Sequence, residues 1–490
     1  MTLSIAFLTA LIAGATLTLV VRNLAHRFAW YDTVRGTRKL HAAPVSRLGG
    51  LALIGGFFAP LVALLWVDSS VGQSFSSEPR IVAALFGGTL VIAALGLYDD
   101  LRGAGASKKF IVQVAVALGL WALGFRIHAV ASPFGGDIAL GYFALPLTVF
   151  WIVGVINAMN LIDGLDGLAG GVAFIVAAAN FVLAFTRGEA LMSLMMAALA
   201  GALLGFLLFN FNPASIFMGD TGSMFLGFVL AAVSVRTSQK SGTAVALLVP
   251  IIALGLPIMD TLLAMARRTV LGRSMFSADK EHIHHRLMSR LMLSQRRAVL
   301  VLYGLCCVFA ATAVALSFAN GAQSIVLLAG IGLVVTVLMR KLGYLNLGAA
   351  PTVQRARQRN IALRTIVRAS TDAVESSRTT QDMWTAAKPL AEAMSASFFE
   401  MYFKGSLKDP GEGVRYEVRR PGEGPLLRWE APLEHQGQVW GTLCVHWQDG
   451  RLEVDRDEEL ALELLADAAA KTLFGFSREP LPANVLSLRK

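Results

Sequence analysis

The sequence contains few cysteines and few charged residues. Only three of its 490 residues are cysteines; Cys306 and Cys307 are adjacent, and Cys444 lies far along the chain. These positions exclude a disulfide framework and a Cys-x-x-Cys metal site. Charged residues make up 16% of the chain, against about 25% in an ordinary soluble domain. Together with a hydrophobic content of 55%, this excludes a single soluble globular domain.

Long apolar segments are abundant instead. Runs of about 15 to 22 residues, each close to the length that crosses a bilayer, recur up to Met339 and then stop. They predict an all-α polytopic membrane protein with about eleven transmembrane helices. The expected spans are Leu3–Val21, Leu48–Val67, Ile81–Tyr98, Phe110–Phe125, Ile138–Ile156, Leu168–Phe185, Ala190–Phe211, Thr221–Val235, Ala244–Met265, Ala298–Phe318 and Ala322–Met339.

Basic residues are distributed unevenly among the loops between these spans. When alternate loops up to Arg297 are assigned to opposite sides, one set carries most of the basic residues. The other set carries only Arg80, Arg126, Arg187, Arg236 and Lys240. The positive-inside rule places the basic set in the cytoplasm, so we expect the N-terminus outside and the C-terminal tail in the cytoplasm. Because an excess of basic residues within a membrane domain reflects its topology, we predict no nucleic-acid partner.

Aspartates gather at the predicted cytoplasmic face. Asp99 and Asp100 end the third span, Asp163 and Asp166 follow the fifth, and Asp220 precedes the eighth. Mg²⁺ prefers one or two carboxylates together with phosphate oxygens and water, and an adjacent acid is then available as a general base. The alternative is structural: Asp163, Asp166 and Asp220 as helix caps, and the adjacent pair as a solvated acidic patch.

Two basic segments lie on the same predicted face. The segment His282–Arg286 has no cysteine partner and no His-Glu-x-x-His spacing, so it suits a diphosphate or nucleotide better than zinc. The first loop either reports topology alone or attracts an anionic lipid headgroup. Its candidate residues are Lys39, His41 and Arg47. Together, the acids and bases indicate transfer of a phosphorylated group from a soluble nucleotide to a lipid.

Four motifs, in this order, resemble those of the bacterial polyprenyl-phosphate N-acetylhexosamine-1-phosphate transferases of glycosyltransferase family 4 type. They are Asp99-Asp100, Asn157–Gly167, Phe217–Gly222 and His282–Leu287. The resemblance covers about residues 1–340. The form His-Ile-His-His-Arg-Leu is more similar to the undecaprenyl-phosphate GlcNAc-1-phosphate transferase branch. The phospho-MurNAc-pentapeptide transferase branch is the alternative.

The resemblance implies a reaction that depends on Mg²⁺, or on Mn²⁺ in its place, at the bacterial inner membrane. Undecaprenyl phosphate would attack the β-phosphorus of a UDP-N-acetylhexosamine, release UMP and start a lipid-linked glycan such as an O-antigen. Asp99, Asp100, Asp163 and Asp166 would form the catalytic set, and Asp220 would bind the metal with Asp166. The substrate-binding residues implied are Lys39, His41, Arg47, Asn160, His282, His284, His285 and Arg286.

The tail does not fit this resemblance. We expect a transferase domain over residues 1–340, a basic juxtamembrane helical linker over 341–375 and a small cytoplasmic α/β domain over 376–490. The run from Ala431 to Leu443 is similar to the last part of a GAF-type sensory domain. The alternative is a dimerisation or docking module, and the partners expected for the tail are a second copy or a regulatory protein.

Two other classes compete with an enzyme. A secondary transporter would also be polytopic, but transporter acids lie near the bilayer midplane, whereas these acids cluster at one face. A membrane sensor or scaffold that has lost activity would explain the tail. The presence of every acidic motif position argues against it.

Overall fold

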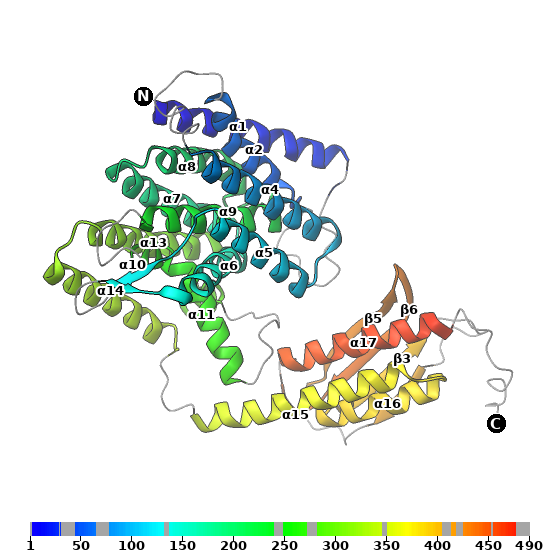
Figure 1. Ribbon diagram of the computed structural model, residues 1–490. Coiled ribbons are helices and arrows are strands. Elements are labelled where there is room, and N and C mark those ends of the chain that lie inside the picture. The colour runs from blue at the N-terminus through cyan, green and yellow to red at the C-terminus, as the bar shows by residue number, and fades with distance from the viewer. Residues whose placement is uncertain are drawn as a thin grey trace, which may run out of the picture. The chain divides into compact units, whose positions relative to one another are not determined.

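The structure is a computed structural model that describes residues 2–28, 30, 45–64, 78–131, 137–239, 248–271, 282–344, 350–403, 413–417, 425–451 and 454–476. The chain divides into two compact units (Figure 1). The first comprises residues 1–266 and 278–346, and the second comprises residues 267–277 and 347–490.

The first unit is a bundle of helices with one short β-hairpin (Figure 1). Its helices are α1 (Thr2–Arg27), α2 (Gly49–Ala63), α4 (Pro79–Arg102), α5 (Ala106–Ala122), α6 (Ala144–Ile162), α7 (Leu168–Thr186), α8 (Ala190–Asn210), α9 (Gly219–Gln239), α10 (Leu248–Ala253), α11 (Gly255–Val270, whose last residues belong to the second unit), α12 (Ile283–Leu291), α13 (Gln295–Leu316) and α14 (Gly321–Lys341).

Eight helices in the described part of the chain are long and apolar enough to cross a membrane. They are α1, α4, α6 with the 3₁₀ turn Gly141–Phe143 before it, α7, α8, α9, α13 and α14. The other three predicted spans fall on the 15-residue α2, the 17-residue α5 and the pair α10 and α11. A multi-pass membrane protein is confirmed, whereas the number eleven stays a prediction.

One predicted span begins later than the hydropathy pattern indicates. Residues Asp137–Ala139 form strand β2, which pairs antiparallel with β1 (Ala129–Ala131), and α6 begins only at Ala144. Gly141 lies between them with φ +51°, a left-handed conformation that an α-helix cannot continue through. The first unit is therefore not entirely helical.

Helices α8 and α9 lie at the centre of the first unit. In their apolar 18-residue stretches 83% and 89% of the residues are buried, whereas the share in α14 is 6%. Small residues let neighbouring helices approach closely, as they do in membrane bundles. A Cβ atom on Gly96 of α4 would lie 2.4 Å from the Cα atom of Thr221, in the first turn of α9. This contact brings the end of α4 to the beginning of α9, where the conspicuous aspartates lie.

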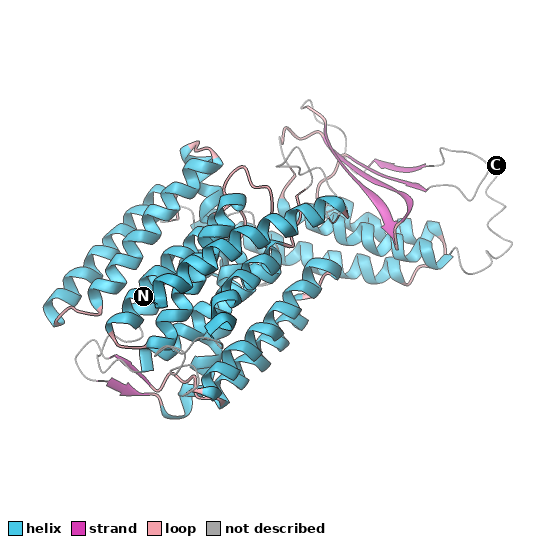
Figure 2. Cartoon of the chain, turned by 90° about the horizontal axis from the view of Figure 1, so that it is seen from above, coloured by secondary structure: helices cyan, strands magenta, loops and turns pink. Residues whose placement is uncertain are grey.

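The second unit consists of a four-stranded antiparallel sheet and three helices (Figure 2): α16 and α17 pack against the sheet, and α15 packs against these two helices. The strand order is β4-β3-β6-β5. The small mixed α/β region predicted near the C-terminus is therefore confirmed. Its elements are α15 (Ala350–Glu375), α16 (Thr380–Ala393), β3 (Phe398–Phe403), β4 (Gly413–Glu417), β5 (Leu427–His435), β6 (Gln438–Trp447) and α17 (Arg456–Phe476).

Helix α15 covers most of the segment predicted as a linker. It contributes Leu363, Val367 and Val374 to the core of the second unit, beside residues of α16, α17 and the sheet. An apolar stripe of this spacing is the face that a helix buries against its own domain. The domain boundaries and the GAF-type similarity stay predictions.

Candidate active site

Asp100 holds the N-terminus of α9. Its Oδ1 atom accepts a hydrogen bond from the Asp220 backbone N–H (2.8 Å), and its Oδ2 atom accepts from the Thr221 N–H (2.9 Å) and hydroxyl (2.6 Å). The first N–H groups of a helix have no partner within the helix, so a carboxylate from another helix satisfies them well. Both oxygens of Asp100 are thus engaged in positioning Asp220.

The first residue of α9 must be small for this contact to form. Gly219 has φ +64°, and a Cβ atom there would lie 2.6 Å from both carboxylate oxygens of Asp100. Any side chain at this position would displace the acid. Glycine at position 219 is therefore needed for Asp100 to reach the N-terminus of α9.

Lys109, at the start of α5, lies between two other aspartates. Its Nζ atom is 2.8 Å from Asp99 Oδ2 and 2.8 Å from Asp220 Oδ2. The other oxygen of Asp99 accepts a hydrogen bond from the backbone N–H of Ala104. Acids from α4 and α9 thus converge on one cation, which offsets their mutual repulsion.

The loop between α6 and α7 carries Asp163 and Asp166 in different environments. Asp166 is 4% exposed, and its Oδ2 atom accepts hydrogen bonds from Asn212 Nδ2 and the Ala214 N–H, both at 3.0 Å. Asp163 receives no side-chain or backbone donor from the described residues. Desolvation, followed by the charges of Asp220 and Asp100, raises the pKa of Asp163 to about 7. Asp163 can therefore exchange a proton near neutral pH.

The first loop is joined to the same region through its backbone. The Phe217 N–H donates to the Ser46 carbonyl (2.8 Å), and the Gly49 N–H donates back to the Phe217 carbonyl (2.9 Å). Arg47, between them, is exposed and close enough for its charge to act on Asp100 and Asp163. Lys39 and His41 lie outside the described residues.

The histidine segment begins the short helix α12. Asp260, a 2% exposed residue of α11, accepts a hydrogen bond from the Ile283 N–H at Oδ1 and contacts His282 Nδ1 at Oδ2, both at 2.8 Å. The His282 and His284 rings are parallel, with centroids 5.6 Å apart. One acid therefore fixes both the start of α12 and the orientation of its first imidazole.

His284 faces the loop that carries Asp163. A Cβ atom on Gly164 would lie 2.9 Å from His284 Nε2, and this buried nitrogen has no hydrogen-bond partner in the described part of the chain. Burial, and then the neighbouring His285, lower the pKa of His284 to about 3, so the ring is neutral at physiological pH. His284 connects α12 to the acidic loop.

The remaining predicted residues of the described chain are Arg286, His285 and Asn160. Arg286 donates to the Leu342 carbonyl (3.1 Å) and lies 4.2 Å above the Tyr344 ring. His285 is partly exposed beside His284, with ring centroids 4.3 Å apart. Asn160 lies one turn before Asp163 on α6 and is partly exposed.

Two residues of this site were missed in the sequence. The sequence pattern singled out neither Lys109 nor Asp260. A signal for Asp260 was present, because it is a lone charge inside the predicted span Ala244–Met265, and intramembrane ionisable residues are functional candidates by default.

The donor set suits Mg²⁺ better than a closed protein metal site. No group of three or more His, Cys, Asp or Glu side chains within the described ranges converges as a metal-binding cluster. Asp99 and Asp220 do converge, and they already attract the ammonium group of Lys109. Two carboxylates with open positions for phosphate oxygens and water are a typical magnesium arrangement.

Comparison with known proteins identifies the family. The sequence model of glycosyl transferase family 4 matches residues 82–238. A probable undecaprenyl-phosphate N-acetylglucosaminyl 1-phosphate transferase of Bacillus subtilis is 38% identical over 317 residues, covering 64% of this chain and 85% of that protein. This chain belongs to glycosyl transferase family 4. The family match includes all five aspartates of the site, from Asp99 to Asp220.

Other family 4 relatives differ in how much of the chain they match. A decaprenyl-phosphate N-acetylglucosaminephosphotransferase of Mycolicibacterium smegmatis is 39% identical over 370 residues, covering 71% of this chain and 89% of that protein. A phospho-N-acetylmuramoyl-pentapeptide-transferase of Listeria monocytogenes is 40% identical over only 173 residues, covering 33% and 51%. The resemblance seen in the sequence is thereby confirmed.

Proposed function

We propose that this chain transfers an N-acetylhexosamine 1-phosphate, with GlcNAc as the expected sugar, from its UDP-sugar to undecaprenyl phosphate. A phosphate oxygen of the lipid attacks the donor's β-phosphorus. The bond from that phosphorus to the oxygen bridging the α-phosphate breaks, and UMP leaves with the electron pair. The observation that carries the proposal is that Asp99 and Asp220 converge on the ammonium group of Lys109, with Asp220 close enough for its charge to act on Asp163, in a member of family 4.

The first unit supplies ligands for a divalent cation. We propose that Asp99 and Asp220 hold Mg²⁺, or Mn²⁺ in its place. The predicted pairing of Asp220 with Asp166 stays a prediction; we add Asp99, because its Oδ2 atom shares the Lys109 ammonium group with Asp220. When bound, the metal would neutralise charge on the donor diphosphate and on the leaving UMP.

The other residues bind, orient or move a proton. Asp163, with a pKa near neutrality, accepts a proton from the lipid phosphate. Asp100 is a positioning residue that acts through α9. The basic groups that would neutralise the substrates' phosphates are Arg47, His282, His285 and Arg286, with Lys39 and His41 from the first loop, while Asn160 lines the nucleotide pocket.

The test is UMP release by the purified full-length protein with undecaprenyl phosphate, Mg²⁺ and a panel of UDP-sugars. UMP release that requires the lipid and is abolished by EDTA and by Asp220→Asn is expected, and the donor that supports it names the sugar. The panel includes UDP-MurNAc-pentapeptide, because turnover of that donor would establish the peptidoglycan alternative. Folded protein that releases no UMP from any donor contradicts the proposal.

The membrane orientation is part of the same proposal. We place the site on the cytoplasmic side of the bacterial inner membrane, with the N-terminus outside and the second unit in the cytoplasm, because the loops on that side carry most of the basic residues. Labelling of single cysteines at Arg47 and Asp372 by a membrane-impermeant reagent in intact cells tests this. Labelling of either position before lysis contradicts the orientation.

We further propose that the second unit contacts a second copy of the chain. Helices α15 and α17 and strand β5 line a groove of about 770 Å³. Its lining includes the apolar Leu460 and Leu464, the basic Arg364 and Arg368, and the acidic Asp467. A two-fold pairing would set the arginines of one copy against the acids of the other. Reversing Arg364 and Arg368 to Glu should abolish cross-linking through a cysteine at Leu464, and unchanged cross-linking contradicts the pairing.

A further inference from the structure

Asp260 and His282 form a buried pair, and Asp260 lies outside all four motifs on which the resemblance rests. Asp260 lies on α11 and His282 is the residue that precedes α12, and their exposures are 2% and 6%. Each carboxylate oxygen has one partner at the start of α12: the Ile283 N–H at Oδ1 and Nδ1 of the preceding His282 at Oδ2, both at 2.8 Å. Burying a carboxylate costs free energy unless it is fully paired, and here it is.

The contact determines which nitrogen of His282 carries the proton. A carboxylate can only accept, so Nδ1 must carry the hydrogen, and Nε2 is then either a lone-pair acceptor or, in the imidazolium, a second donor. The choice of tautomer thus comes from α11, a different helix. Since imidazole roles depend on which nitrogen is protonated, this choice bears directly on what His282 can do.

The position of α12 explains why the orientation matters. Its next histidine, His284, is stacked parallel to His282 and faces Gly164, directly after Asp163. Fixing the first turn of α12 therefore fixes how the histidine segment approaches the acidic loop. The link runs from Asp260 through His282 and His284 to the loop.

We propose that Asp260 is a positioning residue for the transfer reaction: it holds His282 in the Nδ1–H tautomer so that Nε2 faces the donor diphosphate. This rests on the proposed function. The effect on the reaction passes through His282 and not through general destabilisation of the fold. Asp260→Asn tests it best, since the amide keeps the size of the side chain, and its Nδ2 donor forces the opposite tautomer when Oδ1 still accepts from Ile283.

We expect Asp260→Asn to lower kcat for UMP release by on the order of 10² to 10⁴, the range seen when a catalytic histidine loses its orienting acid. KM for the UDP-sugar should change much less. Asp372→Asn, at an exposed position of α15, is the matched control and should behave as wild type. An unchanged kcat for Asp260→Asn overturns the proposal.

A double-mutant cycle separates positioning from capping of α12. If Asp260 acts through His282, Asp260→Asn should cause no further loss of activity in a His282→Ala background. An equal loss in both backgrounds would mean that Asp260 only caps α12, and the proposal would fail. Asp260→Glu retains the carboxylate and should restore part of the activity that Asn loses.

A spectroscopic measurement tests the tautomer without activity. In wild-type protein labelled with ¹⁵N-histidine, the His282 signal, assigned as the one lost in His282→Ala, should show a protonated Nδ1 atom. A neutral His282 with its hydrogen on Nε2 overturns the proposal even if no Asp260 variant folds. If wild type shows the expected tautomer but releases no UMP, then the proposed function fails while the Asp260–His282 coupling stands.

Discussion

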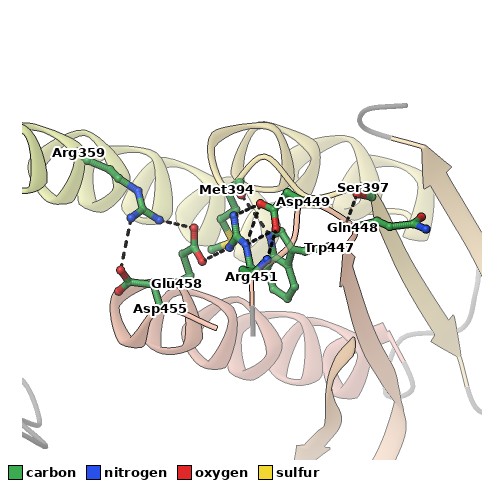
Figure 3. Close-up of polar contacts among 9 residues, drawn as sticks. All are labelled: Arg359, Met394, Ser397, Trp447, Gln448, Asp449, Arg451, Asp455 and Glu458. Carbon is green, nitrogen blue, oxygen red and sulfur yellow. Dashed lines mark hydrogen bonds and ion pairs between the residues drawn. The ribbon is translucent and has the colours of Figure 1, made fainter. Parts of the chain in front are cut away.

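The charge network of the second unit and the aspartates of the active site differ in how fully their charges are paired. In the second unit, Glu458 has a side chain only 1% exposed, and it is paired with Arg359 and, at 2.7 Å, with Arg451 (Figure 3). Arg451 is itself held by Asp449 and lies 5.1 Å from the centre of the Trp447 ring. Each charge in this network has an opposite charge beside it, which is the arrangement expected of a structural site.

The charges of the five active-site aspartates are only partly balanced by cations of the described residues. Five aspartates lie in or beside the site, whereas the cations placed near them by the described residues are Lys109 and Arg47. Asp163 in particular has no ion-pair partner among the described residues, and its pKa is raised to about 7. Among the described residues the carboxylates of this region outnumber the cations, which suits a site that binds a cation together with its substrate. In this protein, fully paired charges therefore mark the structural network of the second unit, and incompletely paired charges mark the candidate active site.

The largest expected effect is a loss of activity without a loss of stability when one of the active-site aspartates is replaced. Asp220→Asn should reduce UMP release by on the order of 10³, because it removes one of two carboxylates that converge on the cation position. The unfolding temperature should change little, since Lys109 keeps Asp99 as a partner. Activity assays and thermal unfolding of the same preparation provide the comparison. A variant that retains activity would mean that Asp220 is only the start of α9.

The pH dependence of stability should distinguish Asp163. Its folded-state pKa of about 7 lies above the ordinary value of 3.8, so between these values the folded protein binds more protons than the unfolded chain. Stability should therefore fall as pH rises from about 4 to 7 and level off above. Asp163→Asn should remove this part of the curve, as measured by thermal unfolding without Mg²⁺. Identical wild-type and variant curves would contradict the raised pKa.

Adjacent residues show how far the sequence could predict this site. The apolar runs and the aspartates at their ends were readable, because both depend on local composition. Asp99 and Asp100 could not be told apart, although one contacts Lys109 and the other caps α9. Neighbours on a helix point about 100° apart, so the rotation of α4 against α9 decides their roles. Gly96 sets that contact, and only the three-dimensional packing reveals it.

The histidine segment shows the same limit. Its three imidazoles were visible in the sequence and zinc was set aside, but Asp260 lies 22 residues earlier and on a different helix. Patterns of hydropathy determine where a helix lies, not which side chains meet across two helices. Likewise, the sequence predicted the mixed α/β character of the second unit but not the charge network that joins α15 to α17.

Replacing an acid of the second unit's charge network should lower stability and leave activity unchanged, the opposite of the effect expected for Asp220→Asn. Glu458→Ala leaves Arg359 and Arg451 without their shared buried partner, and we expect a loss of about 2 kcal/mol in the stability of the second unit, moderated because both arginines are partly exposed. Limited proteolysis of the second unit would detect it as faster cleavage. The kcat for UMP release per folded molecule should remain that of wild type, and a fall as large as that of Asp220→Asn would contradict the comparison.

The smallest expected effect concerns the one cation shared by Asp99 and Asp220. Lys109→Gln removes the ammonium group that competes with a metal ion for these carboxylates. Mg²⁺ should then raise the unfolding temperature more in the variant than in wild type, with an apparent affinity about tenfold tighter, which is close to 1.4 kcal/mol. Titration of unfolding temperature against Mg²⁺ measures this, with Lys471→Gln, at an exposed position of α17, as control. Weaker Mg²⁺ stabilisation in Lys109→Gln would instead mean that Lys109 supports the metal site, so that the carboxylates need both cations at once.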